Sequence, residues 1–230
     1  MRKENGTLFV IATPIGNMDD ISKRAVDYLS SVDEIYSEDT RVTKKLLNNY
    51  GISAKLNSFN ARTESRKIEE VINKLLDGKN IGLVSDAGTP GISDPGIRLV
   101  NKALTKNIKV SGAPGANAAI FALSVSGFPT DSFVFEGFLP QKKGRQKKLM
   151  KLADEERTIV LYESVYRIEK LLNEFVNYMP HRLIAIAREL TKMYEEVWRG
   201  FPANLLENLS ERTLKGEFVV IIAPKNFTLD

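Results

Sequence analysis

A glycine- and proline-rich segment is the part of this sequence whose residue types and spacing best suit ligand binding. It occupies residues 85–96, reads Ser-Asp-Ala-Gly-Thr-Pro-Gly-Ile-Ser-Asp-Pro-Gly, and follows an apolar run at 81–84. Glycine allows positive φ and close approach of the backbone to a small molecule. Asp94 and Pro95 predict an N-cap and a first helical residue, starting a helix that runs to about Lys106. Open α/β sheets bind ligands in such strand-to-helix loops.

The same segment does not match the common nucleotide-binding motifs. Gly91 and Gly96 have P-loop spacing, but Ile97 and Arg98 follow where Lys and Ser or Thr are required. No G-x-G-x-x-G follows a predicted strand. Residue types alone therefore leave two interpretations open, a small-molecule pocket and an ordinary tight turn before a helix.

Two further clusters carry charge. Glu38-Asp39-Thr40-Arg41 lies between the short strand predicted at Ile35 and Tyr36 and a helical pattern at 42–47, which places it at a strand's carboxyl end. Asp39 suits a helix cap and a functional carboxylate equally. Arg41 is disfavoured by the dipole of a helix start, so a phosphate partner explains it better.

The second charged cluster, residues 142–148, holds five cations in seven residues. Lysine runs are usually solvated helix faces, but phosphate contacts of this kind supply most nonspecific RNA affinity.

Composition excludes several enzyme classes. There is no cysteine and one histidine, His181, so a zinc site, a thiolate nucleophile or a histidine-centred triad has almost no residues to be built from. The net charge of +4 suits a polyanionic partner. No apolar run approaches the roughly 18 residues of a membrane span, and we expect a soluble, cytoplasmic protein with no membrane partner.

The elements that must position these clusters alternate along the chain. Short apolar runs at 8–12, 81–84, 133–135, 158–162, 183–187 and 218–222 predict buried strands. Helical periodicity at 68–76 and 168–176 predicts helices between them. The fold class is therefore α/β. The breaker at 111–117 predicts a boundary between an N-terminal α/β domain, 1–112, and a C-terminal α/β domain, 113–230.

The chain also resembles a known family over nearly its full length. The resemblance rests on Ala-Thr-Pro-Ile-Gly-Asn at 12–17, Glu-Asp-Thr-Arg at 38–41, residues 85–96, Phe-Glu-Gly-Phe-Leu-Pro at 135–140, Tyr-Glu-Ser at 162–164, and Ala-Arg-Glu-Leu-Thr-Lys at 187–192 with 195–200 after it. These motifs resemble the tetrapyrrole methylases, the class III S-adenosylmethionine methyltransferases. Within them, the bacterial ribosomal RNA small subunit methyltransferase I family is the most similar.

This resemblance implies a fold, a cofactor and a substrate. It implies two α/β domains with S-adenosylmethionine in the cleft between them, a homodimer, and 2'-O-methylation of a cytidine in 16S rRNA of the small ribosomal subunit. Carried over by position, it implies a cofactor site formed by Pro14, Ser85, Asp86, Gly88, Ile92, Ser93, Ala116, Asn117 and Tyr162.

Methyl transfer from a sulfonium needs the two reactants to be positioned in line and does not need a metal, so we expect no metal site. A carboxylate that accepts or orients the ribose proton would help, and Asp39, Glu38 and Glu163 are the candidates. The candidate RNA-binding residues are Arg41, Arg62, Lys142, Lys143, Arg145, Lys147, Arg167 and Arg188.

The chain departs from the family pattern at three places. Asn60-Ala61-Arg62-Thr63 stands where relatives usually have His-Glu-His-Asn, Val165-Tyr166 where they have Pro-His, and Ala116-Asn117 where they have Pro-Ser. The printed sequence also ends before the C-terminal extension of many relatives. Two alternatives stay open. One is a small-molecule methylase of the same fold acting on a tetrapyrrole, and the other, suggested by the departures at 60–63 and 165–166, is a non-catalytic RNA-binding relative.

Overall fold

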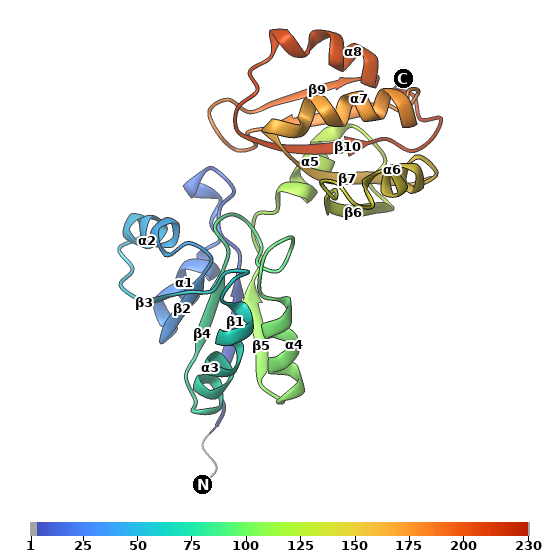
Figure 1. Ribbon diagram of the computed structural model, residues 1–230. Helices are drawn as coiled ribbons and strands as arrows, with labels where there is room; N and C mark the ends of the chain where they lie inside the picture. Colours follow the sequence, from blue (N-terminus) through green and yellow to red (C-terminus); the bar gives the residue numbers. More distant parts are fainter. Residues whose placement is uncertain (1–3, 230) are drawn as a thin grey trace. The chain divides into compact units, whose positions relative to one another are not determined.

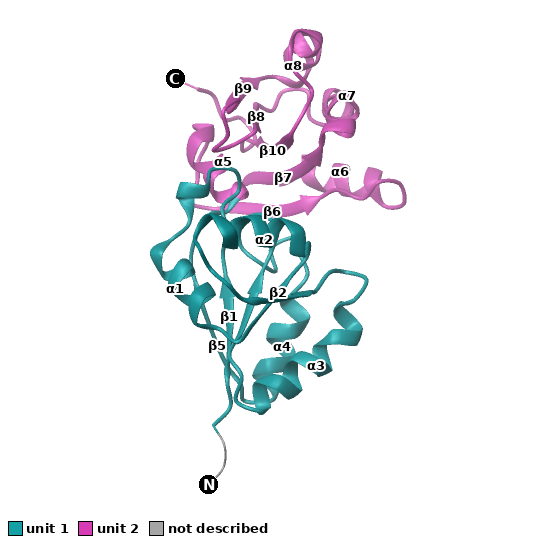
Figure 2. Cartoon of the chain, turned by 90° about the vertical axis from the view of Figure 1, so that its left-hand side faces the viewer, with its two compact units in different colours: residues 1–117 teal, residues 118–230 magenta. Residues whose placement is uncertain are grey.

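The computed structural model describes residues 4–229, which form two compact units, unit 1 up to Asn117 and unit 2 from Ala118 (Figures 1 and 2). The predicted boundary between 112 and 113 falls five residues too early. Residues 111–113 belong to a strand, since Gly112 and Ala113 pair with Val10 and Ile11 in a parallel ladder. The breaker composition at 111–117 therefore marks the last strand of unit 1 together with the turn that follows it.

Unit 1 is a five-stranded, wholly parallel sheet in the order β3-β2-β4-β1-β5. Its elements in chain order are β1 (Thr7–Ile11), α1 (Lys23–Ser31), β2 (Glu34–Ser37), α2 (Thr40–Asn49), β3 (Lys55–Ser58), α3 (Glu64–Leu76), β4 (Ile81–Val84), α4 (Ile97–Thr105) and β5 (Lys109–Ala113), with a short 3-10 helix at Met18–Asp20. Helices α1 and α2 cover one face, where Ile11, Leu29 and Leu46 share a core. Helices α3 and α4 cover the other, where Leu8, Leu75 and Leu99 pack together.

Unit 2 is a mixed five-stranded sheet in the order β6-β7-β10-β8-β9, in which only β6 and β7 run parallel as neighbours. Its elements are α5 (Ala118–Ser126), β6 (Phe133–Phe138), α6 (Arg145–Ala153), β7 (Thr158–Ser164), α7 (Ile168–Tyr178), β8 (Ile184–Arg188), β9 (Glu196–Gly200), α8 (Pro202–Glu207) and β10 (Glu217–Ile222), with 3-10 turns at Val165–Arg167 and Asn208–Glu211. Helices α6, α7 and α8 share one core on the sheet with Trp198. The contacts of α5 run to β7, β8 and β10.

The predicted helices at 68–76 and 168–176 and the six predicted strands are confirmed within α3, α7, β1, β4, β6, β7, β8 and β10. The predicted start of α4 is wrong. The helix begins at Ile97 with Gly96 as its N-cap residue, so Asp94 is not the cap and Pro95 is not the first helical residue. Gly96 has φ of 133°, outside the range of an ordinary N-cap residue, so the chain turns into the helix at Gly96 and not at Asp94.

A buried ion cluster lies where β2 begins. Glu34 is 2% exposed and its carboxylate is 2.8 Å from Lys74 Nζ, 3.1 Å from Lys79 Nζ and 3.2 Å from Lys55 Nζ. Burial alone would raise the pKa of Glu34, but hydrogen bonds from Lys74, Lys79 and Lys55 outweigh it and lower that pKa to about 2. The cluster ties β2 to β3, to α3 and to the segment that leads into β4.

We expect Glu34→Gln to destabilise unit 1 by roughly 3 kcal/mol at pH 7, because it leaves three lysines around a neutral group. The folded pKa of about 2 lies below the ordinary value of 4.5, so Glu34 stabilises the fold above pH 4.5 and loses this effect as pH falls. The difference in stability between variant and wild type should therefore shrink as pH falls from 4.5 to about 2. Hydrogen exchange of β2 peptides in the full chain measures it. Glu69→Gln, which removes a surface pair with Lys102, is the control and should change β2 exchange little.

Candidate functional site

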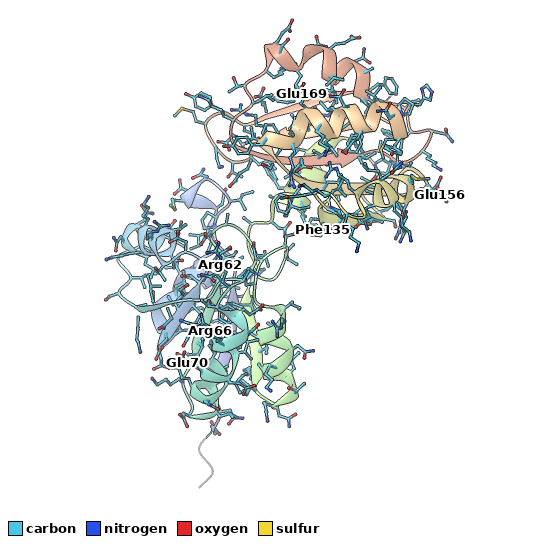
Figure 3. All side chains as sticks on the ribbon, in the orientation of Figure 1. Arg62, Arg66, Glu70, Phe135, Glu156 and Glu169 are labelled. Atoms are coloured by element: carbon cyan, nitrogen blue, oxygen red, sulfur yellow. The ribbon has the colours of Figure 1, made fainter. Side chains whose placement is uncertain are left out.

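The loops that carry the polar motifs of unit 1 lie at one edge of its sheet. Ser37 pairs with Val84 and with Ser58, and Ile11 pairs with Ala113, so the parallel strands end together. The segments that leave this edge are 12–17, 38–41, 59–63, 85–96 and 114–117. Figure 3 shows Arg62 near this end of unit 1, with Arg66 and Glu70 following along α3. The predicted placement of 38–41 and 85–96 at strand carboxyl ends is confirmed.

The loop after β4 is held by backbone hydrogen bonds. Thr13 N–H donates to Gly88 O at 2.9 Å, and Gly88 N–H donates to Thr13 O at 3.1 Å. Gly88 has φ of 81°, and a Cβ there would lie 3.2 Å from Ile15 Cγ2 and 3.3 Å from Ala116 O. The Thr89 hydroxyl donates to the same Ala116 O at 3.1 Å. The turns after β1, β4 and β5 thus form one bonded assembly that needs glycine at position 88.

Three carboxyl groups crowd this edge. The pKa of Glu38 is raised by burial and by the neighbouring Asp86 and Asp39. Burial raises the pKa of Asp86 as well. Burial, with the charges of Glu38 and Asp86, raises the pKa of Asp94 to about 6, although a hydrogen bond with Ser85 opposes the shift. Ionisation of these carboxyl groups is therefore unfavourable, and a bound cation would stabilise their ionised forms.

Asp86 links the two predicted polar segments. Its carboxylate accepts a hydrogen bond from Asp39 N–H at 2.8 Å, joining the loop after β4 to the start of α2. Two neighbouring pockets meet at this residue. One is lined by 13–16, Met18, 85–87 and residues of α2. The other is lined by 38–41, Ser58, Asn60 and Asp86.

Asp39 caps α2, because its carboxylate accepts Arg41 N–H at 2.8 Å, and it also pairs with the Arg41 guanidinium at 2.6 Å. Hydrogen bonds from Arg41 lower the pKa of Asp39 to about 2. A carboxylate with this pKa is a weak proton acceptor at neutral pH, whereas the raised pKa of Glu38 suits one. Arg41 remains 88% exposed on its side chain and is accessible to a phosphate.

The remaining residues assigned to the cofactor divide between the units. In unit 1, Pro14 lines the first pocket, Ile92 is exposed, Ser93 adopts φ of 64°, and Ala116 and Asn117 end the unit. In unit 2, Tyr162 lies near the end of β7, where its ring contacts Phe135 at 5.1 Å and Phe138 at 5.7 Å. Their cofactor roles stay predictions.

The motifs of unit 2 also meet at one sheet edge. Phe138 pairs with Tyr162, Glu217 with Ser164, and Phe218 with Arg188, which brings together the ends of β6, β7 and β8 and the start of β10. Tyr166 and Tyr194, in the loops that leave this edge, are 94% and 68% exposed. Trp198, in contrast, is buried.

Three of the candidate residues of unit 2 belong to one buried ion network. Arg145 is 4% exposed, pairs with Glu174 at 2.6 Å and lies 3.6 Å from Glu163. Arg167 pairs with the other oxygen of Glu163 at 2.6 Å. Glu163 therefore sits between two guanidinium groups and is 3% exposed. The catalytic role of Glu163 and the RNA roles of Arg145 and Arg167 stay predictions, and the network gives all three a structural role.

The other RNA candidates differ in exposure. Arg188 is 6% exposed and donates to Lys215 O and Glu196, so it holds the edge between β8 and β9. Lys142, Lys143, Lys147 and Arg62 are exposed. Within residues 4–229, no carboxylate pairs with Lys142, Lys143 or Lys147. His181 is exposed, and the described residues contain no group of acids and histidine suited to a metal.

Asp94 is the site residue that sequence reasoning missed. The dipeptide Asp-Pro resembles a helix start, and this local interpretation concealed the contact of Asp94 with Ser85 and its proximity to Glu38 and Asp86. The same loop gave the only available signal, an acid between two glycines in a segment already predicted to bind a ligand.

A family model describing Tetrapyrrole (Corrin/Porphyrin) Methylases matches residues 7–206. The chain is 45% identical over 222 residues to "Ribosomal RNA small subunit methyltransferase I" of Halalkalibacterium halodurans, covering 96% of this chain and 77% of that relative. It is 42% identical over 220 residues to the protein of the same name from Thermotoga maritima, covering 96% of this chain and 99% of that relative.

Solved structures share the fold at lower identity. A diphthine synthase structure has a TM-score of 0.76 at 15% identity, covering 96% of this chain and 91% of that one. A uroporphyrin-III C-methyl transferase from Thermus thermophilus, solved with S-adenosyl homocysteine, has a TM-score of 0.65 at 14% identity, covering 95% and 97%. No helix among residues 4–229 is long and apolar enough to cross a membrane.

The hydrogen bond from Asp39 N–H to Asp86 gives a direct prediction. Asp86→Ala removes the acceptor and should speed exchange of the Asp39 amide and destabilise unit 1 by about 1 kcal/mol. Asp86→Asn keeps an oxygen acceptor and lowers the negative charge, so it should be at least as stable as wild type. Amide exchange at Asp39 and urea unfolding measure both effects. Equal destabilisation in the two variants would contradict the assignment.

Proposed function

The chain belongs to the tetrapyrrole methylase family, and from this membership we propose that it transfers a methyl group from S-adenosylmethionine to the ribose 2'-hydroxyl of a cytidine in 16S rRNA. One observation carries the proposal. The chain is 42–47% identical, over 94% or more of its length, to proteins named ribosomal RNA small subunit methyltransferase I.

The residues at the edge of unit 1 fit the proposed cofactor. S-adenosylmethionine carries positive charge on its sulfonium and its α-amino group. A ligand with these charges stabilises the ionised forms of the crowded carboxyl groups of Glu38, Asp86 and Asp94. The pocket that Asp86 and Pro14 line also contains apolar side chains, Ile15, Met18, Val42 and Leu46. Polar and apolar lining together suit an amphipathic small molecule.

The chain's own residues bind and orient rather than form a covalent intermediate. When bound, the cofactor supplies an electrophilic methyl group for in-line displacement by the ribose oxygen. Among the three candidate carboxylates, Glu38 is the best suited to accept the hydroxyl proton, since Asp39 is held by Arg41 and Glu163 by two arginines. Asp86, through Asp39 N–H, keeps the segment that carries Glu38 in place.

The exposed lysines of unit 2 and Arg41 of unit 1 are the proposed phosphate contacts. Lys142, Lys143 and Lys147 lie in and just before the first turn of α6, and the neighbouring Lys148 instead pairs with Glu136. The three lysines have no carboxylate partner within residues 4–229, and cations that bind RNA phosphates release counterions from the RNA, which favours association. Arg41 keeps its ion pair with Asp39 but is 88% exposed on its side chain.

We also propose that the protein is a homodimer and acts in the cytoplasm. The resemblance to the family supports the first, and a ribosomal substrate supports the second. Analytical ultracentrifugation of the full chain at micromolar concentration would return a monomer mass if the dimer proposal is wrong.

The central experiment is mass-spectrometric mapping of 16S rRNA from cells with and without this chain. We expect one ribose methyl on a cytidine to disappear on deletion and to return with the wild-type chain. An unchanged methylation pattern would contradict the RNA substrate. Methylation of a tetrapyrrole by the purified chain would favour the small-molecule methylase, and RNA binding without S-adenosylmethionine binding would favour a non-catalytic relative.

The pKa of Asp94 predicts how cofactor binding depends on pH. A cation binds the ionised carboxylate, so below about pH 6 each bound cofactor must displace a proton. Calorimetric titration from pH 8 to pH 5 should show affinity falling by up to about ten-fold per pH unit below 6. Asp94→Asn should weaken binding at pH 7.5 and flatten this profile.

The same variant separates binding from stability. Because burial raises the pKa of Asp94 in the folded chain, its ionised form costs folding free energy at neutral pH, and Asp94→Asn should stabilise the free chain by about 1–2 kcal/mol. Asp131→Asn, at an exposed position in unit 2, is the control and should change neither quantity. A loss of stability in Asp94→Asn would show that the carboxylate is structural.

The basic segment predicts a salt dependence. Lys142→Gln with Lys143→Gln should reduce the slope of log affinity against log salt for single-stranded RNA by about 1.4, since each phosphate contact contributes about 0.7. The matched control replaces two exposed lysines of unit 1, Lys106 and Lys109, by Gln. Filter binding from 50 to 300 mM salt measures the slopes. Equal slopes for the two double variants would exclude this segment from the RNA surface.

A further inference from the structure

The strand β6 contains a β-bulge that places Phe138 on the same face of the unit 2 sheet as Phe135. Phe135 pairs with Val160 and Gly137 with Leu161, so Glu136 is an extra residue, and Gly137 adopts φ of 59°. A bulge re-aims the side chains that follow it. Here it puts Phe138 beside Tyr162, on the same face as Phe135, although strict alternation would place Phe135 and Phe138 on opposite faces.

The three rings form one cluster at the edge of the sheet. The ring centroid of Tyr162 is 5.1 Å from that of Phe135, in an edge-on arrangement, and 5.7 Å from that of Phe138, in a tilted one. Figure 3 shows Phe135 on β6, within unit 2. Phe138 is the outermost ring and is 54% exposed, whereas Leu139 beside it is 3% exposed in the core under α6 and α7. Unit 2 thus buries the apolar neighbour and leaves the aromatic ring accessible.

A cation lies near the exposed ring. The Arg167 guanidinium is 6.0 Å from the ring centroid of Phe138 and is fixed by its ion pair with Glu163. Its buried Nε has no hydrogen-bond partner within the described chain. An accessible ring beside a fixed guanidinium suits a flat group that stacks and accepts hydrogen bonds.

The basic segment begins four residues after Phe138. Lys142 and Lys143 are exposed, and Lys147 follows in the first turn of α6. Proteins that bind single-stranded nucleic acid combine aromatic rings, which stack on bases, with nearby cations that follow the backbone. Here both features come from one continuous stretch, 138–147, so their proximity is fixed by the chain itself.

From these contacts we infer that Phe138 is a base-stacking residue, on which one unpaired nucleotide of the RNA substrate lies while the lysines at 142, 143 and 147 contact its phosphates. The inference rests on the proposed RNA substrate and adds the residue that selects single-stranded RNA. Stacking accepts any base, so Phe138 gives preference for an unpaired nucleotide and leaves the base identity to other contacts.

The test measures binding of the full chain to a 12-nucleotide oligocytidylate and to inorganic polyphosphate of similar charge. Phe138→Leu keeps an apolar side chain without the ring and should weaken oligocytidylate binding by about 5- to 100-fold. Polyphosphate binding should stay within two-fold of wild type, because that probe has no base. Phe138→Tyr should restore oligocytidylate binding. Met150→Leu, at a 56% exposed apolar position on α6, is the matched control and should behave as wild type.

Four results of these measurements would overturn the inference. Oligocytidylate binding within two-fold of wild type in Phe138→Leu would exclude stacking, and an equal loss for both probes would show a change in the basic segment. A loss of S-adenosylmethionine affinity would assign the ring to the cofactor, and a changed sedimentation mass would assign it to a subunit interface. If the wild-type chain binds oligocytidylate but leaves 16S rRNA unmethylated, the proposed function fails while the stacking test stands.

Discussion

The parallel arrangement of the five strands β1 to β5 is the constraint on which unit 1 depends. Parallel neighbours end at the same edge, so five loops from distant parts of the chain must meet there. Helices cover both faces of the sheet, which leaves this edge as the place where backbone and polar side chains remain accessible. The reciprocal backbone bonds between Thr13 and Gly88 then fix the two central loops to each other.

The parallel arrangement also brings acidic groups together, which makes their ionisation unfavourable. Glu38 and Asp86 follow neighbouring strands, so the register that pairs Ser37 with Val84 also brings their carboxyl groups together, and Asp94 joins them from the same loop. Their raised pKa values are the sign of that unfavourable ionisation. At the opposite end of the strands, Glu34 has three lysine partners and a lowered pKa. In unit 1, lysines thus neutralise Glu34, which supports the fold, whereas no cation pairs with Glu38 or Asp86, which line a pocket, among the described residues.

In unit 2 the family motifs contain both buried ion pairs and exposed side chains. Arg145 and Arg188 hold loops through buried bonds, although their residue type had suggested phosphate contacts. Glu163 shows the same division, since its motif lies at the sheet edge while two arginines engage its carboxylate. The accessible groups lie near these anchors in the sequence, namely Phe138, the lysines at 142, 143 and 147, and Tyr166. Buried ion pairs thus fix the loops that display exposed side chains.

The sequence by itself determined the α/β class, the strands of the sheet interiors and the helices α3 and α7, because buried central strands are continuous apolar runs and amphipathic helices repeat with the helical period. It missed β3, β5 and β9, and these are all edge strands. An edge strand packs on one neighbour only, so residues such as Lys55, Asn57 and Gly112 are tolerated and the apolar signal disappears.

The motifs could likewise be recognised in the sequence, but only the tertiary structure decided which of their charged side chains are exposed and which are buried in ion pairs. Arg145 and Lys142 look alike in a basic run, yet Arg145 is buried because Glu174 and Pro140, 29 and 5 residues away, supply its partners. Asp94 looks like a helix cap until Glu38 and Asp86 are brought beside it. Local composition records the type of a side chain, whereas its ionisation and exposure depend on neighbours that folding supplies from elsewhere in the chain.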